Sequence, residues 1–286
     1  MCEYRLGLPR DRTLRQDRRP TEGLTATRSL AACRGHRAAA QRRGAGDLGD
    51  DAGDARLHLR GPLAAACRAH LWTLFPYLPK QPGYNKRLRK ATGLIRCLTR
   101  ALACGTTLWS DDVWVVDSTP VKCGRSRETV KRSDLAGWVQ YGYCASHTRY
   151  FWGLRLHLVC TLHGLPIAFA VTGAKADERE RLLDILAVEP QLTDERPGQT
   201  LIGDKNYFGS EFEQQLAELD IQLLRPSRKG EAERPGSQLF KPLRQIIESV
   251  NETFKGQLDL ERHRGRTPSG VAVRVLQRIL ALTAAI

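Results

Sequence analysis

Several residue types that build a hydrophobic core are absent from the first 60 residues of this chain. These residues contain no Val, Ile, Phe, Trp or Lys, whereas 13 of them are Arg. Ordering a backbone costs roughly 1–2 kcal/mol per residue, and so little apolar surface cannot offset that cost. We therefore predict that residues 1–68, which are rich in Arg, Ala and Gly, form a low-complexity disordered segment. A flexible basic arm and a stretch translated from the wrong reading frame both remain as interpretations.

Two other absences narrow the class of protein. No apolar run approaches the roughly 20 residues that span a membrane, and the N-terminus lacks the apolar segment of a signal peptide. The eight cysteines include no Cys-x2-Cys pair, so we expect no zinc site. We therefore expect a cytoplasmic protein with reduced thiols and no membrane partner.

Acidic residues are scarce on both sides of a central segment that is rich in them. Residues 61–110 contain eight Lys or Arg and no Asp or Glu, and residues 221–286 contain 12 basic and six acidic residues, a net of +6. Residues 111–220 contain 12 basic and 17 acidic residues, a net of −5. The whole chain carries +14, which favours a polyanionic partner, usually nucleic acid. This distribution suits a metal site between two nucleic-acid contacts, and a solvated basic face is the alternative.

Residues 69–110 are predicted to form a short basic helical segment. Prolines interrupt its beginning, and an amphipathic pattern follows. Four basic residues lie close to Tyr84 and are candidates for contact with a DNA backbone, namely Lys86, Arg87, Arg89 and Lys90. A solvent-exposed helix face would have the same composition.

From residue 111 onward, short apolar runs typical of strands alternate with helical patterns. We predict strands at 113–116, 150–162, 166–171, 200–203 and 221–224, with helices near 176–188, 210–219 and 268–286 and a further helix that Pro242 opens. The order is strand, hairpin, helix, strand, helix, strand, helix, which is that of an RNase H-like domain. We therefore predict an α/β fold for residues 111–286, with a mixed five-stranded sheet flanked by helices and an insertion at about 122–150.

Three acidic residues occupy informative positions in this pattern. Asp117 and Asp204 each follow a predicted strand, and Glu248 lies in a predicted helix. In the predicted sheet the strands of the two aspartates lie side by side, and the helix brings a carboxylate back over them. Three carboxylates can bind two Mg²⁺ (or Mn²⁺) ions, which activate an attacking oxygen and stabilise a leaving one. Asp117 taken alone is equally consistent with a strand-end cap.

Two basic residues share nearly the same helical face as Glu248. Arg244 lies four residues before it and Lys255 lies seven after. Arg244 can bind the carboxylate or a phosphate, and Lys255 can reach a DNA backbone. An ordinary surface ion-pair ladder would show the same spacing.

These motifs together resemble those of bacterial insertion-sequence transposases of the DDE type, in the branch with a Tyr-x2-Arg-x3-Glu-x6-Lys signature. The chain matches three of the four positions with Arg244, Glu248 and Lys255, and Lys241 replaces the tyrosine. The stretches Val-Val-Asp117-Ser-Thr-Pro-Val and Ile-Gly-Asp204-Lys-Asn-Tyr also look like that group, as does the stretch from Tyr150 to Val159. The resemblance covers roughly residues 70–286.

The resemblance implies a DNA transposase with an RNase H-like catalytic core and two divalent metal ions. It implies Asp117, Asp204 and Glu248 as catalytic metal ligands, with Arg244, Lys255 and Lys205 added to the DNA-binding candidates. The substrates would be terminal inverted repeats and target double-stranded DNA, and the protein would act as a homo-oligomer on DNA in the bacterial nucleoid.

The chain also departs from that family at both ends. Members usually begin with a helical DNA-binding region, which residues 1–68 do not resemble, and the last predicted helix stops without a cap. We therefore expect a copy with a frame-disrupted N-terminus and a truncated C-terminus that retains all three acids. A metal-dependent DNA nuclease without strand transfer and a catalytically inactive DNA-binding remnant are the alternative functions.

Overall fold

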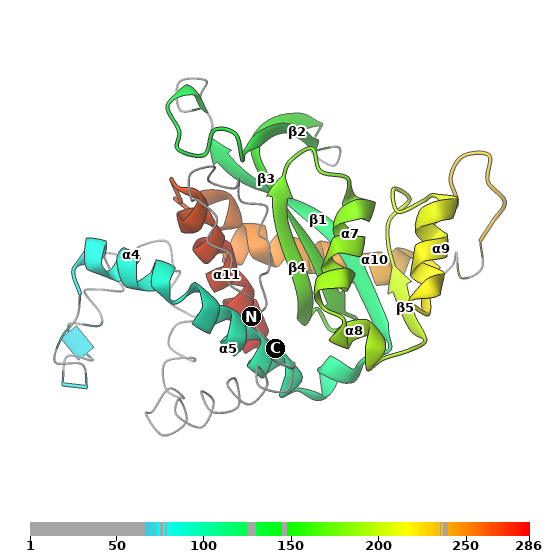
Figure 1. Cartoon of the computed structure of the whole chain (residues 1–286), viewed down its shortest axis with the longest axis horizontal. Helices are drawn as coiled ribbons and strands as arrows, with labels where there is room; N and C mark the ends of the chain where they lie inside the picture. The colour runs from blue at the N-terminus through cyan, green and yellow to red at the C-terminus, as the bar shows by residue number, and fades with distance from the viewer. Residues whose placement is uncertain are drawn as a thin grey trace, which may run out of the picture.

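The computed structural model describes residues 67, 69–70, 73–74, 77, 79–124, 130–144, 148–234, 236 and 240–286 (Figure 1). The segment 1–68, for which the sequence predicts disorder, lies outside these residues except for Cys67. The first long elements are helices α4 (Gln81–Lys90) and α5 (Thr92–Cys104), followed by a short 3₁₀ helix, η1 (Thr107–Ser110). Helix α5 packs against the last helix, α11 (Pro268–Ala285), so the predicted basic helical segment is docked on the rest of the protein.

The described strands form one mixed sheet with the order β2-β3-β1-β5-β6. Its strands are β1 (Val113–Gly124), β2 (Gln140–Cys144), β3 (Arg149–Thr161), β4 (Pro166–Gly173), β5 (Gln199–Ile202) and β6 (Ile221–Leu224). Strand β3 runs antiparallel to β1, whereas β1, β5 and β6 are mutually parallel. The predicted mixed sheet is confirmed, with six described strands where the sequence predicted five.

The additional strand is β2, which lies in the insertion near residues 122–150. It pairs with the first part of β3, from Arg149 to Gly153, and β4 pairs with the second part, from Leu154 to Cys160. Both strands therefore occupy the same edge of β3, and the sheet remains five positions wide. The polar and glycine-containing sequence of the insertion concealed this strand.

The first strand is longer than its apolar run predicted. It continues past Val116 because it pairs with β3 from Trp114 to Gly124, whereas its pairing with β5 ends at the pair Val115–Ile202. Pro120 lies beyond that point, so its missing N–H leaves no acceptor of β5 unpaired. On the β5 side, the second half of β1 therefore has no neighbouring described strand.

Helices cover both faces of the sheet, as Figure 1 shows with α7 in front and α10 and α11 behind. Helices α7 (Glu178–Val188) and α9 (Ser210–Glu218) pack on the face that contains Trp114 and Val116. Helices α10 (Phe240–Glu252) and α11 pack on the face that contains Val115. Because side chains alternate along a strand, β1 is buried on both faces, as expected for the central strand of an α/β sheet.

Short elements complete the described fold. Helix α8 (Gln191–Asp194) precedes β5, and a π-helical turn, η4 (Thr253–Gln257), continues α10 into a 3₁₀ turn, η5 (Leu260–Arg262). Pro242 falls in the first turn of α10, where backbone N–H groups have no intrahelical acceptor. Within the described residues, none of the helices combines the length and apolar character needed to cross a membrane.

Candidate metal centre and nucleic-acid interface

Asp117 and Asp204 lie at the same end of two paired parallel strands. The last β1–β5 pair joins Val115 to Ile202; Asp117 lies two residues after Val115, within β1, and Asp204 lies two residues after Ile202, beyond the end of β5. Both residues line one small cavity of about 40 Å³, together with Arg244 of α10. The structure therefore brings together two of the three acids that the sequence singled out.

Asp117 is half-buried and is held by the helix behind the sheet. Its Oδ2 accepts a hydrogen bond of 2.8 Å from Nδ2 of Asn251, which is buried on α10. Burial raises the pKa of Asp117 to about 7, with smaller increases from the charges of Glu178 and Asp204, against the lowering by a backbone hydrogen bond from Ser118 and by Arg244. A carboxyl group in this position releases its proton far more readily when a cation is nearby.

Asp204 is held by the loop that it begins. Its Oδ1 accepts a hydrogen bond of 2.7 Å from the backbone N–H of Asn206, and its Oδ2 accepts one of 2.9 Å from the side chain of the same residue. Burial raises the pKa of Asp204, as does the charge of Glu178, and Arg244 lowers it. The two aspartates thus share one electrostatic environment.

Glu248 has a different surrounding. Its side chain is 56% exposed, and its Oε1 lies 2.9 Å from Nε of Arg244, one turn earlier on α10. Among the described residues that line the cavity, α10 contributes Phe240, Arg244 and Ile247, which are spaced as one helical face. Glu248 is not among the residues that line the cavity, and its carboxylate binds Arg244, which does line it.

The donor set of the cavity fits a hard divalent cation. Both aspartates offer carboxylate oxygens, which Mg²⁺ and Mn²⁺ prefer, and the pKa of each acid is raised first by burial and then by neighbouring carboxylates. Within the described part of the chain, no three His, Cys, Asp or Glu side chains lie close enough to hold one ion together. The pair Asp117 and Asp204 is therefore the centre of the candidate site.

The sequence did not point to Asn251 or Glu178, although both act on Asp117. Asn251 lies seven residues after Arg244 on the same helix, so that spacing is the signal that could have identified it. Glu178 is the first residue of α7. An acid at that position ordinarily complements the helix dipole, so the pattern gave no reason to assign it to a site.

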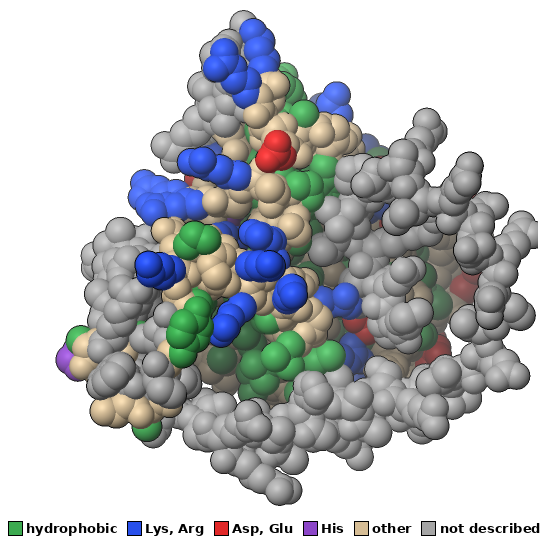
Figure 2. All heavy atoms as spheres, turned by 60° about the vertical axis from the view of Figure 1, so that its left-hand side comes forward, with side chains coloured by type: hydrophobic (Ala, Val, Ile, Leu, Met, Phe, Trp, Pro, Cys, Tyr) green, Lys and Arg blue, Asp and Glu red, His purple; other side chains and the backbone are tan. Residues whose placement is uncertain are grey.

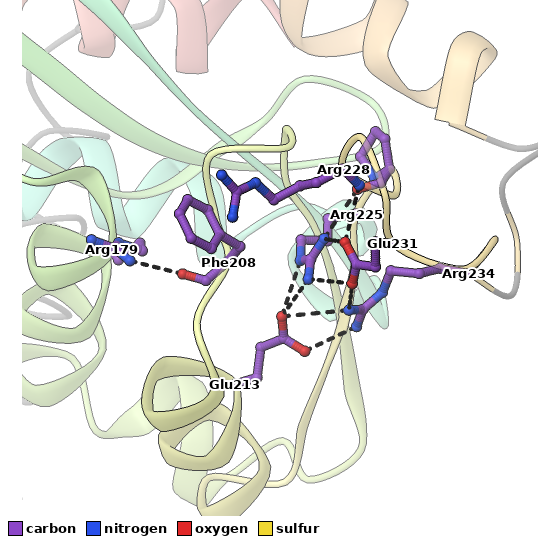
Figure 3. Close-up of polar contacts among 8 residues, drawn as sticks. Arg179, Phe208, Glu213, Arg225, Arg228, Glu231 and Arg234 are labelled. Atoms are coloured by element: carbon purple, nitrogen blue, oxygen red, sulfur yellow. Dashed lines mark hydrogen bonds and ion pairs between the residues drawn. The ribbon is translucent and has the colours of Figure 1, made fainter.

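The loop after β6 forms one wall of the cavity through Pro226, and a charged network holds this loop in place (Figure 3). The buried guanidinium of Arg225 contacts Glu213 of α9 and Glu231 of the loop. Arg234 contacts the same two carboxylates, each at 3.0 Å. This network fixes the position of the loop against α9.

Phe208 lies between two guanidinium groups at the edge of the same region (Figure 3). The guanidinium carbon of Arg179 lies 5.1 Å from the ring centroid, and that of Arg228 lies 3.6 Å from it. Arg179 also donates a hydrogen bond of 2.8 Å to the carbonyl oxygen of Phe208. These contacts hold the loop that carries Asp204 against α7.

The predicted DNA-binding residues fall on two parts of the surface. Figure 2 shows Lys and Arg side chains gathered on the face that carries α4, where four of the candidates are exposed, namely Lys86, Arg87, Arg89 and Lys90. Lys205 is exposed beside Asp204. Lys255 lies in η4, 3.5 Å from Glu252, so a π-helical turn alters the helical spacing that links it to Glu248.

The chain has one family match and weak structural similarities. The model of the transposase DDE domain matches residues 108–284. A search of curated proteins finds no match. A Mos1 transposase paired-end complex with the left transposon end is 10% identical, with coverage of 88% of this chain and 82% of that one and a TM-score of 0.27. A pre-cleavage Mos1 transpososome is 9% identical, with coverage of 96% of this chain and 82% of that one and a TM-score of 0.26.

The family match covers more than half of the sequence. This chain therefore belongs to the transposase DDE domain family and is an enzyme of polynucleotidyl transfer.

Proposed function

We propose that this protein is a DNA transposase that cuts at the ends of an insertion sequence and joins the freed 3′-hydroxyls to target DNA. The observation that carries the proposal is the cavity that Asp117 and Asp204 share, with Arg244 between them and Glu248. It lies in the part of the chain that matches the family model. Residues 111–286 would form the catalytic domain, and residues 69–110 a basic segment docked on it.

Asp117, Asp204 and Glu248 are the residues that would hold the metal ions, Mg²⁺ or Mn²⁺. When bound, two such ions lower the pKa of an attacking water or 3′-hydroxyl and neutralise charge on the leaving oxygen. The protein prepares its ligands beforehand, since Asn251 orients Asp117 and Asn206 holds both oxygens of Asp204. Such outer contacts fix the direction of metal-binding oxygens.

Arg244 has a second role in this proposal. Arg244 lines the cavity and its guanidinium binds Glu248, so it could exchange that carboxylate for a phosphate of the substrate. Such an exchange would free Glu248 while the DNA is held. The arginine therefore couples DNA binding to the availability of the third acid.

DNA contacts come from the basic surface. We propose that the four exposed basic residues of α4 contact phosphates, and that Lys205 and Lys255 contact the strand near the acids. The partners would be terminal inverted repeats and target duplexes, bound by a homo-oligomer in the cytoplasm.

A strand-transfer assay tests the proposed activity. Purified full chain is given a labelled duplex copied from the DNA that flanks its gene, a supercoiled target plasmid and Mg²⁺ or Mn²⁺. We expect a labelled product joined to the plasmid. Cleavage without joining would instead identify a nuclease, and binding without any chemistry would identify an inactive DNA-binding remnant.

A further inference from the structure

A groove of about 720 Å³ lies between the inserted strand β2 and the start of helix α7. Its volume falls within the range of about 300–1,000 Å³ that is typical of ligand-binding sites. Three exposed tyrosines line it, namely Tyr141, Tyr143 and Tyr150. Among the described residues only five aromatic side chains are exposed, so three of the five gather at this one groove. Single exposed apolar residues are ordinary, whereas a cluster indicates a binding surface.

Two of these tyrosines present their rings to solvent as a pair. Tyr143 of β2 lies directly opposite Tyr150 of β3 in the ladder, and their ring centroids are 5.0 Å apart with an interplanar angle of 54°. Tyr150 is 79% exposed and Tyr143 is 44% exposed. Both rings therefore keep apolar surface in water that a second flat group could cover.

The strand that carries Tyr141 and Tyr143 is held firmly in place. The side-chain oxygen of Gln140 accepts a hydrogen bond of 3.2 Å from the backbone N–H of Lys175. Gly142 packs so closely that a Cβ at this position would lie 2.7 Å from the Cβ of Ala174. The aromatic surface is therefore formed before any ligand binds, which reduces the entropy cost of binding.

The charged residues of the groove leave it with a small positive charge. Asp177 pairs with Arg179 at 2.7 Å, and Glu178 pairs with Arg155. Lys175 is exposed, and its side chain pairs with no carboxylate of the described residues. Exposed rings beside such a cation suit a single-stranded nucleic acid, whose bases stack on aromatic side chains while its phosphates contact basic ones.

Two residues of the groove also contact the candidate metal centre. Asn206 lines the groove and donates hydrogen bonds to both carboxylate oxygens of Asp204. Arg155 lines the groove and donates a hydrogen bond of 2.9 Å to the hydroxyl of Ser118, the residue after Asp117. A DNA strand with a phosphate at the two aspartates would therefore have this groove beside it.

We propose that the groove binds unpaired bases of the DNA strand that leaves the metal centre, stacked on Tyr143 and Tyr150, with Lys175 on a phosphate. Bases inside a duplex stack on one another and offer no free face, so the occupant is single-stranded. This inference rests on the proposed function and names the form of DNA that lies beside the acids. A contact between two copies of the protein is the competing explanation for the exposed rings.

Fluorescence anisotropy of the full chain in EDTA tests the proposal without any chemistry. One probe is a labelled oligothymidylate of about 10 nucleotides, within the roughly 4–16 that such sites cover, and the other is a duplex of the same length. Tyr143→Ala and Tyr150→Ala should each weaken binding of the single strand about 5–150-fold, the effect of losing one stacked base. The duplex affinity should stay close to the wild-type value.

The matched controls are Tyr143→Phe and Tyr150→Phe, which keep the ring and remove the hydroxyl. Both should bind the single strand as tightly as the wild type, and a loss equal to that of the Ala variants would contradict stacking. Because Tyr150 is largely exposed, Tyr150→Ala should also keep the wild-type melting temperature.

Salt dependence separates the rings from the cation. Stacking involves no phosphate charge, so Tyr150→Ala should lower the affinity for the single strand without changing its salt dependence. Lys175→Ala should make the slope of the logarithm of the binding constant against the logarithm of the salt concentration less steep by about 0.7. A changed slope in Tyr150→Ala would contradict the stacking role.

The same variants distinguish failure of this inference from failure of the proposed function. If the wild type joins DNA ends and both Ala variants bind the single strand normally, the transposase proposal stands and the groove assignment is wrong. If the Ala variants instead change the sedimentation of the protein and not its single-strand affinity, the rings contact a second copy, which also overturns the assignment. If the tyrosines bind the single strand as expected but no DNA is cut or joined, the groove stands and the proposed function fails.

Discussion

Asn251 donates a 2.8 Å hydrogen bond to Asp117, and this contact joins helix α10 to the central strand of the sheet. The same helix carries Arg244 and Glu248, so the position of the third acid depends on the helix that holds the first. We therefore regard Asn251 as the residue that sets the spacing between strand and helix in the candidate site.

Replacing Asn251 by Ala should destabilise the protein and reduce cleavage. The change leaves a half-buried carboxylate oxygen without its donor, which costs about 1–3 kcal/mol of unfolding free energy. Urea denaturation measures the stability, and a nicking assay measures cleavage. Gln245→Ala, at an exposed position of the same helix, should change neither. Equal stability of the two variants would show that the contact to Asp117 contributes nothing.

Each of the three acids should be essential for chemistry and dispensable for DNA binding. Asp117→Asn, Asp204→Asn and Glu248→Gln keep the size of each side chain and remove a charge, so we expect cleavage to fall to background in all three. Electrophoretic mobility shifts with a duplex end should remain close to wild type. Normal cutting by Glu248→Gln would exclude this exposed residue from the site and leave the two aspartates.

The raised pKa of Asp117 predicts a pH dependence with a definite sign. The folded protein holds this proton up to a pKa of about 7, whereas an unfolded chain releases it near about 4. Between these values the folded state binds more protons, so stability is lost as pH rises through the window. In EDTA we expect the unfolding free energy to decrease from pH 5 to 7.5, and to do so less in Asp117→Asn. Identical pH profiles would contradict the raised pKa.

The candidate DNA-binding residues should differ in how strongly each one affects the salt dependence of the DNA-binding constant. The logarithm of the DNA-binding constant falls linearly with the logarithm of the salt concentration, and loss of one phosphate contact makes this slope less steep by about 0.9. We expect that reduction for Lys255→Ala, and a reduction approaching four times as large when Lys86, Arg87, Arg89 and Lys90 are all replaced by Ala. Fluorescence anisotropy between 50 and 200 mM salt, the range over which such contacts are resolved, gives both slopes. A slope unchanged in Lys255→Ala would identify it as a bystander paired with Glu252.

Arg225→Ala should destabilise the wall of the cavity. The guanidinium is buried and neutralises Glu213 and Glu231, so its loss should cost about 3 kcal/mol of unfolding free energy. Lys229→Ala, at an exposed position of the same loop, serves as the control in denaturation experiments. A loss below about 0.5 kcal/mol, the range of ordinary surface substitutions, would show that Arg234 alone suffices.

The sequence predicted the order of the strands better than their extents. The apolar run Val113–Val116 identifies a buried strand because it combines three β-branched residues with Trp114. The polar second half of β1 and the whole of β2 were not predictable in this way, because pairing with β3 decides their conformation. Local sequence carries little information about such pairing.

The same distinction applies to the candidate site. The predicted strands indicated that Asp117 and Asp204 lie close together, and both line one cavity because each lies two residues after the last pair of the parallel strands β1 and β5. Helical spacing could not predict whether the carboxylate of Glu248 points toward the two aspartates or toward Arg244. In the structure it binds Arg244, one turn earlier on α10. Spacing also assumed a regular α-helix as far as Lys255, which the π-helical turn after Glu252 does not provide.

The shared edge of β3 has an evolutionary consequence. Because β2 takes a place along β3 that β4 leaves free, the polypeptide between β1 and β3 can grow or shrink at the rim without displacing the strand that carries Asp117. Relatives should therefore tolerate large differences in length between Gly124 and Arg149, and acquire new specificity there while the chemical centre stays in place.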